Sequence, residues 1–335
     1  SKSMIAKSRR LLLLVFVFFS GYSSAQVLGC TDKLSKNYNP LASSNDGSCC
    51  YPKKSIRPYS SVLLNEQLHE TSGLLFLDGF LWTHNDDTDT HLYALDTISG
   101  KIVKRIKLNH TANTDWEEIA QDSAYLFIGD FGNNYKGNRK DLKVLRIEKQ
   151  SLLLNQPKID TIAFQYPNQT DFSLQHSNRT NFDCEAMIVG QDSLFLFTKE
   201  WKSKKTSLFS LPKTPGDYVA NYKATHSVKG LITGATYLKN QKLIALCGYS
   251  KKLKPFIYLL YDFEDNDFFL GNRRKIKLKL PFHQIEGIAT NDGLHYYLSN
   301  ENFTRKPIVS VLQQLHMLDL TFFLKHYLES QKVKK

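Results

Sequence analysis

Acidic side chains recur beside apolar segments along this 335-residue chain. Some stand just before an apolar segment, as Glu117 does, and others stand just after one, as Asp130 does. The acidic candidates are Asp86, Asp115, Glu117, Asp130, Asp183, Glu185, Glu200, Glu286 and Glu301. Carboxylate oxygens are hard ligands, so a group of them favours Ca²⁺ or Mg²⁺ over zinc. If the fold gathers these side chains, their mutual repulsion must be relieved by a cation, by Lys or Arg, or by backbone N–H groups.

Three roles are open for such a group. In the first, a divalent cation binds at Glu117, Glu185 and Glu286 and either stabilises the fold or bridges to a ligand. In the second, each carboxylate accepts backbone N–H bonds from a neighbouring sheet and is purely structural. In the third, a carboxylic acid with a raised pKa and a carboxylate partner, or a metal-bound water, cleaves a phosphate or glycosidic bond.

Other common catalytic signatures are missing from residues 26–335. This part of the chain contains no nucleophile elbow, HExxH, P-loop or CxxC. Three tryptophans, Trp82, Trp116 and Trp201, lie near the acidic segments and could either stack on a sugar or pack between sheets. The functional prediction therefore depends on the carboxylates.

The elements that must position these residues are short β-strands. Between residues 58 and 320, β-branched and aromatic runs alternate with turns, and no long helical pattern appears. A three-residue segment recurs, and each copy is followed by a turn, a second apolar strand and a third strand. The copies are Ser72-Gly73-Leu74, Glu117-Glu118-Ile119, Glu185-Ala186-Met187, Thr233-Gly234-Ala235 and Glu286-Gly287-Ile288.

These five units predict an all-β fold, a β-propeller of five four-stranded blades over residues 58–320. The fifth unit ends before its fourth strand, and the strand SSVLLNEQL ahead of the first unit can supply it and close the ring. A β-sandwich would not explain five aligned units. The long second unit leaves room for a sixth blade or for surface insertions. Residues 321–335 indicate a tail or a short amphipathic helix.

Propeller geometry explains how distant acids can meet. In a blade, the start of the innermost strand and the end of the second strand lie on the same face, near the axis. The nine acidic candidates occupy these two kinds of position. We therefore expect them around one mouth of the axial channel, with Ca²⁺ as the possible cofactor.

The first 25 residues have the layout of a secretory signal peptide. Four basic residues precede an apolar run at 11–19, which is too short to span a membrane, and small residues precede an expected cleavage after Ala25. Residues 1–25 hold four basic and no acidic side chains, so cleavage lowers the net charge from +12 to +8. The remaining basic runs are typical of solvated strand faces, and no nucleic-acid partner is expected.

Residues 26–52 predict a small, turn-rich module. Outside the cytoplasm, Cys30 and Cys49 are expected to form a disulfide. Hard oxygens in this loop could bind Ca²⁺ or simply cap turns, and they belong to Asp32, Asn37, Asn39 and Asp46. Pairing stays open for the other cysteines, Cys50, Cys184 and Cys247, the last two of which could form a second disulfide or remain free.

Two family resemblances rest on these motifs. Residues 29–49, GCTDKLSKNYNPLASSNDGSC, resemble the GCTDxxAxNYNPxAxxxDGSC modules of secreted and surface proteins from Bacteroidetes-type bacteria. The segments DWEEI (115–119), DCEAM (183–187) and IEGIA (285–289) resemble the blade starts of SdiA-regulated-type and phytase- or esterase-like extracellular propellers. Both resemblances imply a protein that works outside the cytoplasm.

The sequence thus predicts a secreted binding or interaction protein with a Ca²⁺ site at the axial mouth. Its expected partner is an extracellular glycan, phosphorylated compound or protein, and we expect a monomer without a membrane span once the signal peptide is removed. The alternative is an extracellular hydrolase of phosphoesters or carbohydrates that uses the same carboxylates.

Overall fold

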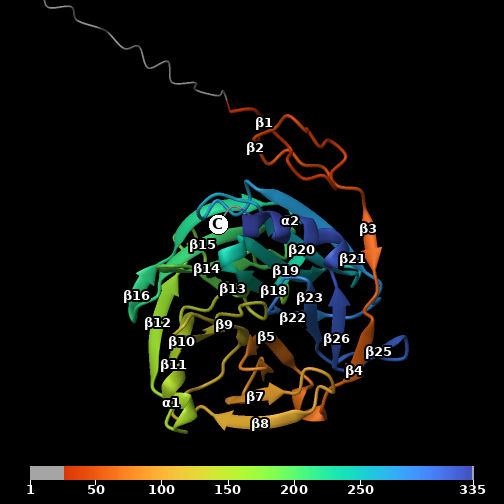
Figure 1. Ribbon diagram of the computed structural model, residues 1–335. Coiled ribbons are helices and arrows are strands. Elements are labelled where there is room, and N and C mark those ends of the chain that lie inside the picture. The colour runs from red at the N-terminus through yellow and green to blue at the C-terminus, as the bar shows by residue number, and fades with distance from the viewer. Residues whose placement is uncertain (1–25, 334–335) are drawn as a thin grey trace, which may run out of the picture.

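The computed structural model describes residues 26–333, so the predicted signal peptide at 1–25 lies outside the described residues. Five sheets surround one axis and form a five-blade β-propeller, which confirms the predicted fold class and blade number (Figure 1). The long second unit holds one blade and long loops, so no sixth blade is present in residues 26–333.

Each blade runs from an innermost strand near the axis to an outer strand. Blade 1 consists of β5 (Thr71–Leu77), β6 (Phe80–Asn85), β7 (His91–Leu95) and β8 (Ile102–Lys107). Blade 2 consists of β9 (Trp116–Gln121), β10 (Tyr125–Asp130), β11 (Lys143–Glu148) and β12 (Ile159–Gln165), with β16 (Gly216–Val219) added in parallel at its edge. Blade 3 consists of β13 (Cys184–Val189), β14 (Ser193–Thr198), β15 (Thr206–Pro212) and β17 (Asn221–His226).

The last two blades both recruit strands from the N-terminal part of the chain. Blade 4 consists of β18 (Leu231–Leu238), β19 (Leu243–Tyr249), β20 (Pro255–Tyr261) and β21 (Asn272–Leu278), and β3 (Lys54–Ile56) pairs with it in parallel. Blade 5 consists of β22 (Ile285–Thr290), β23 (His295–Asn300) and β26 (Gln314–Asp319), and β4 (Ser60–Leu63) supplies its fourth strand. The ring is therefore closed by the N-terminal strand that the sequence predicted.

The remaining elements are short or peripheral. They are β1 (Leu28–Gly29), β2 (Ser44–Asn45), η1 (Glu66–Leu68), α1 (Lys149–Leu153), η2 (Lys239–Gln241), β24 (Phe303–Arg305), β25 (Val309–Val311) and α2 (Thr321–Val333). The predicted tail or short helix is thus helix α2. No helix in residues 26–333 has the length and apolar character needed to cross a membrane.

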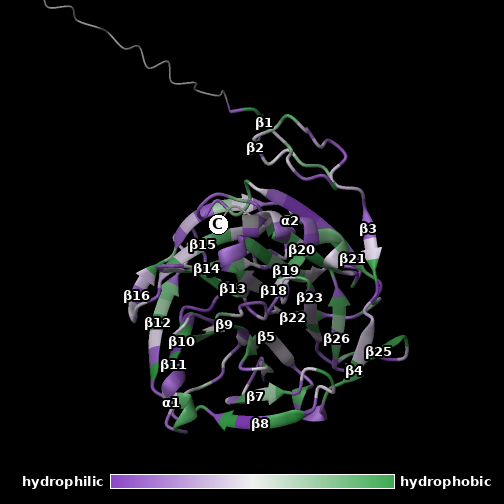
Figure 2. Cartoon of the chain, viewed as in Figure 1, coloured by the Kyte–Doolittle hydropathy of each residue, from purple (hydrophilic) through white to green (hydrophobic). Residues whose placement is uncertain are grey.

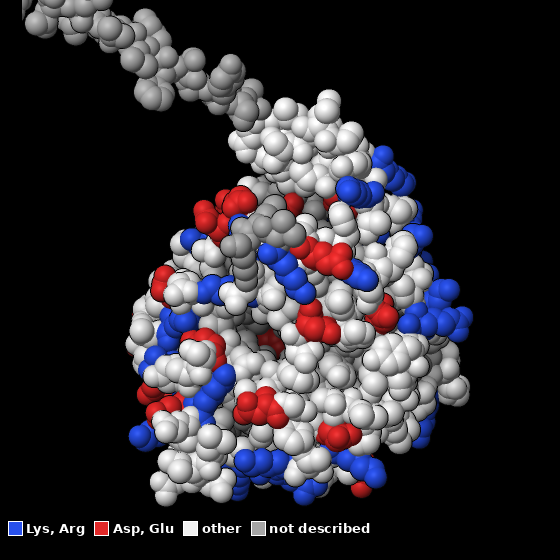
Figure 3. Space-filling model, in the orientation of Figure 1, with Lys and Arg blue, Asp and Glu red and all other residues white. Residues whose placement is uncertain are grey.

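Hydrophobic side chains pack between neighbouring blades and hold them together. Each of the five buried clusters joins two adjacent blades: Phe127 of blade 2 packs with Phe209 of blade 3, and Leu81 of blade 1 packs with Leu315 of blade 5. Hydrophobic residues run along the blade strands, whereas many loops are hydrophilic (Figure 2). Lys, Arg, Asp and Glu are interspersed over the face seen in Figure 3, which is hollowed near its centre.

A β-bulge interrupts every innermost strand at the same level. The pairing with the second strand shifts between Ser72 and Leu75, Trp116 and Glu118, Cys184 and Ala186, Ile232 and Gly234, and Ile285 and Gly287. A bulged residue leaves the ladder and its side chain is re-aimed. In blades 2 to 5 the bulged residue is the first of the repeated triplet, so its side chain turns toward the axis. In blade 1, Ser72 stays paired with His84 and the bulge follows it.

The N-terminal module docks on the outer part of blade 4. The predicted Cys30–Cys49 disulfide is present. Asp32 accepts hydrogen bonds from the hydroxyls of Tyr51 and Tyr261, both at 2.7 Å. The thiols of Cys184 and Cys247 are free and buried, and Cys50 is free and exposed.

Candidate functional site

A cavity of about 390 Å³ opens on the face where the innermost strands begin. Its wall contains carboxylates from four blades, two lysines and a few aromatic and apolar side chains. The residues that line it are Ser72, Asp86, Glu117, Asn134, Asn178, Glu185, Lys199, Trp201, Leu231, Tyr249, Ser250, Lys251, Leu253, Gln284, Glu286 and Glu301.

The inner ring of the cavity comes from the first residue of each repeated triplet. These residues are Ser72, Glu117, Glu185, Thr233 and Glu286, one from each blade. In blades 2 to 5 the bulges explain why these side chains face the axis, whereas Ser72 reaches the same wall from a paired position. Four of the five line the cavity, while Thr233 donates its hydroxyl proton to the carbonyl of Ile285.

A second ring comes from the residues that end or follow the second strands. The strand registers place Asp86, Phe131, Lys199, Tyr249 and Glu301 at equivalent positions. All except Phe131 line the cavity. This ring supplies Lys199, the lysine that contacts Glu185, and two further carboxylates.

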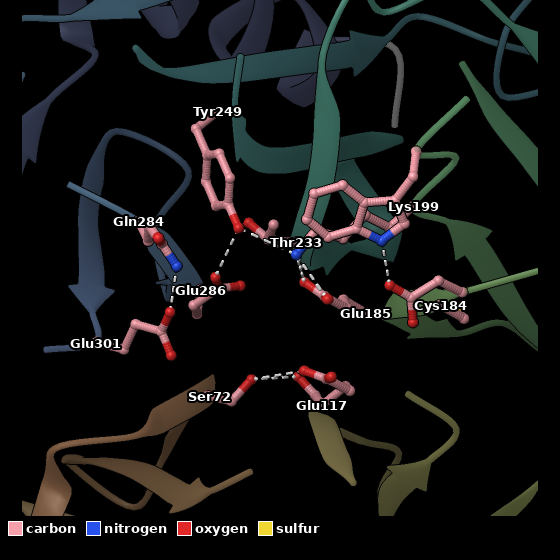
Figure 4. A network of polar contacts seen from close by, with 12 residues as sticks. Ser72, Glu117, Cys184, Glu185, Lys199, Thr233, Tyr249, Gln284, Glu286 and Glu301 are labelled. Atoms are coloured by element: carbon pink, nitrogen blue, oxygen red, sulfur yellow. Dashed lines mark hydrogen bonds and ion pairs between the residues drawn. The ribbon is translucent and has the colours of Figure 1, made fainter. Parts of the chain in front are cut away.

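Lys199 is the centre of a buried polar chain (Figure 4). Its ammonium donates to both carboxylate oxygens of Glu185 at 2.6 Å and to the hydroxyl oxygen of Tyr249 at 3.1 Å. The Tyr249 hydroxyl in turn donates to Oε1 of Glu286 at 3.3 Å. Since Lys199 and Glu185 are 3% and 2% exposed, the pair compensates two charges that burial would otherwise make very costly.

Acceptors without partners remain on the opposite part of the wall. Oε2 of Glu286 is buried and accepts no hydrogen bond, and Oδ1 of Asp86 is in the same situation. Glu301 accepts from the side-chain amide of Gln284. Figure 4 shows Glu117, Glu185, Glu286 and Glu301 around a shared space. Unpartnered buried acceptors call for a donor or a cation that enters the cavity.

Three buried carboxylates from blades 2 and 3 form the tightest acidic group. Glu117, Asp183 and Glu185 each have an oxygen within 4.8 Å of the others. Oε2 of Glu117 accepts from Ser72 at 3.3 Å. Asp183 is fixed by the backbone N–H of Asn133 at 2.8 Å and by Nε1 of Trp201 at 2.7 Å. A second group, Glu70, Asp86 and Asp87, lies nearer the surface of blade 1.

Burial and mutual repulsion raise the pKa of these acids. Desolvation is the first cause in every case; a neighbouring carboxylate adds to it at Glu117, Glu301 and Asp86, whereas Lys199 opposes it at Glu185 and Glu286. The pKa values of Asp86, Glu286 and Glu301 each rise to about 8, and those of Glu117 and Glu185 rise well above the ordinary value of a carboxyl. Lys199 keeps its proton because Glu185, Tyr249 and Glu286 raise the pKa of the ammonium against its desolvation. The cavity without a ligand therefore holds several protonated carboxyls at neutral pH.

Five of the nine acids predicted at the mouth line the cavity: Asp86, Glu117, Glu185, Glu286 and Glu301. Asp183 contacts this group from behind. Asp115 lies beside it, where burial and Asp183 raise the pKa of its carboxyl to about 7.

Asp130 and Glu200 are not among the lining residues. Asp130 forms ion pairs with Arg139 at 2.9 Å and Lys143 at 3.2 Å. The Glu200 carboxylate accepts hydrogen bonds from the hydroxyls of Thr198, Ser203 and Ser207 and so stabilises the turn that follows β14.

The tryptophans and the module residues also separate into distinct settings. Trp201 lines the cavity, whereas Trp82 and Trp116 belong to the buried cluster between blades 1 and 2.

In the N-terminal module, four side-chain oxygens accept hydrogen bonds from backbone N–H groups. Asp32 accepts from Leu34, Asn37 from Cys50, Asn39 from Leu41 and Asp46 from Ser48. The contacts of Asp32, Asn39 and Asp46 are turn caps, whereas that of Asn37 links two distant parts of the module.

Sequence reasoning missed Ser72, Lys199, Tyr249 and Gln284 as wall residues. The repeat alignment already placed Ser72 in the position of the glutamates, so that signal was available. Lys199 and Tyr249 occupy the position equivalent to Glu301, directly after the residue of the second strand that pairs with the residue before the triplet. Aligning the second strands by this register would have identified both residues.

No protein-family model matches the chain, and no curated protein matches it in sequence. Among solved structures, it is similar to glutaminyl cyclase from Myxococcus xanthus at 11% identity, over 80% of this chain and 100% of that one, with a TM-score of 0.45. It is also similar to exo-β-1,3-galactanase from Phanerochaete chrysosporium at 8% identity, over 80% of this chain and 64% of that one, with a TM-score of 0.48. We take no functional argument from likenesses at this level.

Proposed function

We propose that this protein binds a hard divalent cation, Ca²⁺, in its axial cavity and uses the cation to hold an extracellular ligand. The observation that carries the proposal is the buried group of Glu117, Asp183 and Glu185, whose oxygens lie within 4.8 Å of one another. Carboxylates at such spacing are the ligands that Ca²⁺ prefers.

The charge balance of the cavity supports a cationic occupant. Lys199 neutralises one carboxylate, Glu185, while Glu117, Glu286, Glu301 and their neighbours have no ammonium or guanidinium partner in residues 26–333. Among the described residues, none donates a hydrogen bond to Oε2 of Glu286. A divalent cation would relieve the repulsion that otherwise keeps protons on these groups.

The rest of the wall is suited to the body of a ligand. Trp201, Leu231, Tyr249 and Leu253 provide aromatic and apolar surface in the same cavity as the acids. A glycan or phosphorylated compound could place oxygen atoms on the cation and its less polar face on this surface. The cavity volume of about 390 Å³ matches a small ligand or the end of a larger one.

The test is a thermal melt of residues 26–335 in EDTA and in millimolar Ca²⁺, together with calorimetric titration. A concentration 100 times the Kd should raise Tm by about 4 °C. Glu117→Gln and Glu286→Gln each remove one negative charge with little change of shape, and should reduce the shift to less than about 1 °C. Glu185→Gln is unsuitable, because it leaves Lys199 without its partner and destabilises the fold by itself.

The matched control is Glu329→Gln, an exposed side chain on α2. It should retain the full Ca²⁺ shift. The absence of a shift with both Ca²⁺ and Mg²⁺ in the unaltered chain would refute the cation proposal.

A hydrolase is the second candidate, and a specific observation favours it. Glu286 and Glu301, with pKa values of about 8, lie in the same cavity as Glu185, which the Lys199 ammonium contacts, so the site offers a protonated acid and a second carboxyl group held by an ammonium. Turnover of nitrophenyl phosphates or glycosides that Glu301→Gln abolishes, with Ca²⁺ affinity unchanged, would assign the hydrolase. Without turnover across such a panel, the binding function stands.

The place of action is also a proposal. We infer that residues 26–335 work outside the cytoplasm, after removal of residues 1–25, because the Cys30–Cys49 disulfide is compatible with an oxidising compartment. The division into a module at 26–52, a propeller at 58–320 and a C-terminal segment at 321–335 remains part of this proposal. Mass spectrometry of the protein recovered from its host would test the cleavage after Ala25.

A further inference from the structure

The second residue of each repeated triplet lies on the axis, below the acidic cavity. In four blades this residue is small: Gly73, Ala186, Gly234 and Gly287. Their backbones approach closely, since a Cβ on Gly287 would lie 2.8 Å from Leu74 and one on Gly234 would lie 3.0 Å from the Glu286 carbonyl oxygen. Only blade 2 has a long side chain at this level, that of Glu118.

The Glu118 carboxylate is completely buried and is held by backbone N–H groups. Oε1 accepts from Ile119 at 3.1 Å, and Oε2 accepts from Ala235 of blade 4 at 2.8 Å. Burial raises the pKa of the Glu118 carboxyl well above its ordinary value, and the N–H groups of Leu74 in blade 1 and Met187 in blade 3, which also face it, oppose that rise together with those of Ile119 and Ala235. In four blades, the backbone N–H of the third triplet residue thus points at the Glu118 side chain.

This set of donors is selective for an anion. Backbone N–H groups that converge on one point bind negative charge, in the way that nests and helix N-termini bind phosphate or sulfate. A cation would meet only repulsion there. No Lys or Arg of residues 26–333 forms an ion pair or hydrogen bond with Glu118, so the N–H groups are its whole compensation.

The same side chain separates two cavities. Above it, the cavity described above is lined by the first residues of the triplets, including Glu117 and Glu185. Below it, a cavity of about 220 Å³ is lined by the third residues, including Ile119 and Met187. Glu118 lines neither cavity and lies between them along the axis.

We propose that the axis of this propeller contains a built anion-binding site for a small carboxylate or halide, and that the Glu118 side chain permanently occupies it as an internal ligand. The carboxylate holds four blades together and closes the channel, so that a ligand reaches the acidic cavity from one face only. This role is independent of the cation proposal, because it uses different donors and does not require a metal.

The experiment is removal of the internal ligand and its replacement from solution. Glu118→Ala leaves the N–H groups unpaired and should lower Tm by about 5–10 °C. Sodium formate or bromide should then restore at least about 3 °C, relative to the same ionic strength of bulky gluconate. Bromide in crystals of this variant should give an anomalous peak within hydrogen-bond distance of the Ile119 and Ala235 nitrogens.

Two comparisons make the result decisive. Glu117→Ala, the neighbour that faces the acidic cavity, should show no difference between formate and gluconate. Glu118→Gln keeps the shape but places an amide N–H₂ against backbone donors, so it should also melt below the unaltered chain, and it gives the answer if Glu118→Ala does not fold. A Gln variant as stable as the original, or a folded Ala variant that responds equally to formate and gluconate, would overturn the proposal.

Discussion

Lys199 decides how the acidic cavity can respond to a cation. Its ammonium uses both oxygens of Glu185, so it competes with any metal for that carboxylate. In Lys199→Met we expect unfolding in EDTA to become easier by about 3–5 kcal/mol, because Glu185 loses its buried partner. The same variant should bind Ca²⁺ about tenfold more tightly or better, since a repelling charge is gone.

Chemical denaturation with and without Ca²⁺ measures both effects. Lys202→Met, which removes an exposed lysine of the neighbouring turn, is the matched control and should change neither quantity. A Lys199→Met variant that is destabilised but no longer responds to Ca²⁺ would instead make the lysine part of the binding site.

The raised carboxyl pKa values predict an unusual pH dependence for the cation-free protein. Asp86, Glu286 and Glu301 titrate near pH 8 when folded and near 4 when unfolded, so between these values the folded state binds more protons. Stability must therefore fall as pH rises from about 5 to 8, by about 1 kcal/mol per pH unit or more when several groups contribute.

Buried histidines limit stability at the acidic end. Burial lowers the pKa of His84 to about 4 and that of His316 to about 3, so stability is also lost as pH falls below about 6.5. Denaturant titrations in EDTA at pH 6, 7 and 8 should show the decline, and saturating Ca²⁺ should flatten it. Glu301→Gln should reduce the slope, whereas stability that rises from pH 6 to 8 in EDTA would contradict the assignment.

Two of the predicted acids, Asp130 and Glu200, stand one position away from the ring that contains Lys199 and Tyr249. Side chains alternate between the faces of a strand, so a neighbour points elsewhere. Asp130 precedes the position equivalent to Lys199 and Tyr249, and Glu200 follows it. Because the candidates were chosen for their negative charge, Asp130 was selected in blade 2 instead of Phe131, and Glu200 in blade 3 instead of Lys199. The repeated triplets were aligned correctly, because three of them begin with a glutamate and these glutamates fix the alignment of the repeat.

At the scale of elements, β4 decides whether the ring is closed. It pairs with β26 through four residues, and Ser61 hydrogen-bonds to Nδ1 of His316, whose Nε2 contacts Asn300 of β23, both at 2.7 Å. The strand therefore connects to the interior of blade 5 and also covers an edge that would otherwise be open.

Truncations can separate closure from docking. A chain that starts at residue 64 lacks β4 and should lose its cooperative melt and aggregate, because β26 is left as an exposed edge. A chain that starts at residue 53 keeps β3 and β4 and should still unfold in one transition. Circular dichroism and light scattering distinguish these outcomes, and equal behaviour of the two chains would contradict a closing role for β4.

Other elements could not be derived from local patterns. β16 extends blade 2 although it follows β15 of blade 3, and β3 extends blade 4 although it precedes blade 1. Both pair in parallel with strands distant in sequence. Such additions depend on which edge remains open after the blades assemble, and a short strand such as Lys54–Ile56 carries no signal of that partner.

At the scale of the whole molecule, the module and the propeller form one unit. Asp32 links Tyr51 and Tyr261, and the module's Asn45 donates to Asp262 at 3.0 Å and to Asn272 at 2.9 Å. The guanidinium of Arg274 lies 4.6 Å from the Tyr51 ring centre and is almost fully buried. These contacts are too extensive for a freely tethered domain.

If the two parts unfold together, the disulfide must stabilise both. Replacing Cys30 and Cys49 by Ser frees a loop whose closure contributes about 3 kcal/mol, so the melt of the entire propeller should shift downward as a single transition. The docking contacts involve the β20–β21 loop, on the face opposite the acidic cavity, so the Ca²⁺ response should persist. A separate, early transition that leaves the propeller melt unchanged would show instead that the module unfolds on its own.

Tyr261→Phe tests the docking contact without breaking the disulfide. It removes one hydroxyl that donates to Asp32 but keeps the ring. Because docking then weakens while the covalent link remains, the same single transition should shift by a smaller amount.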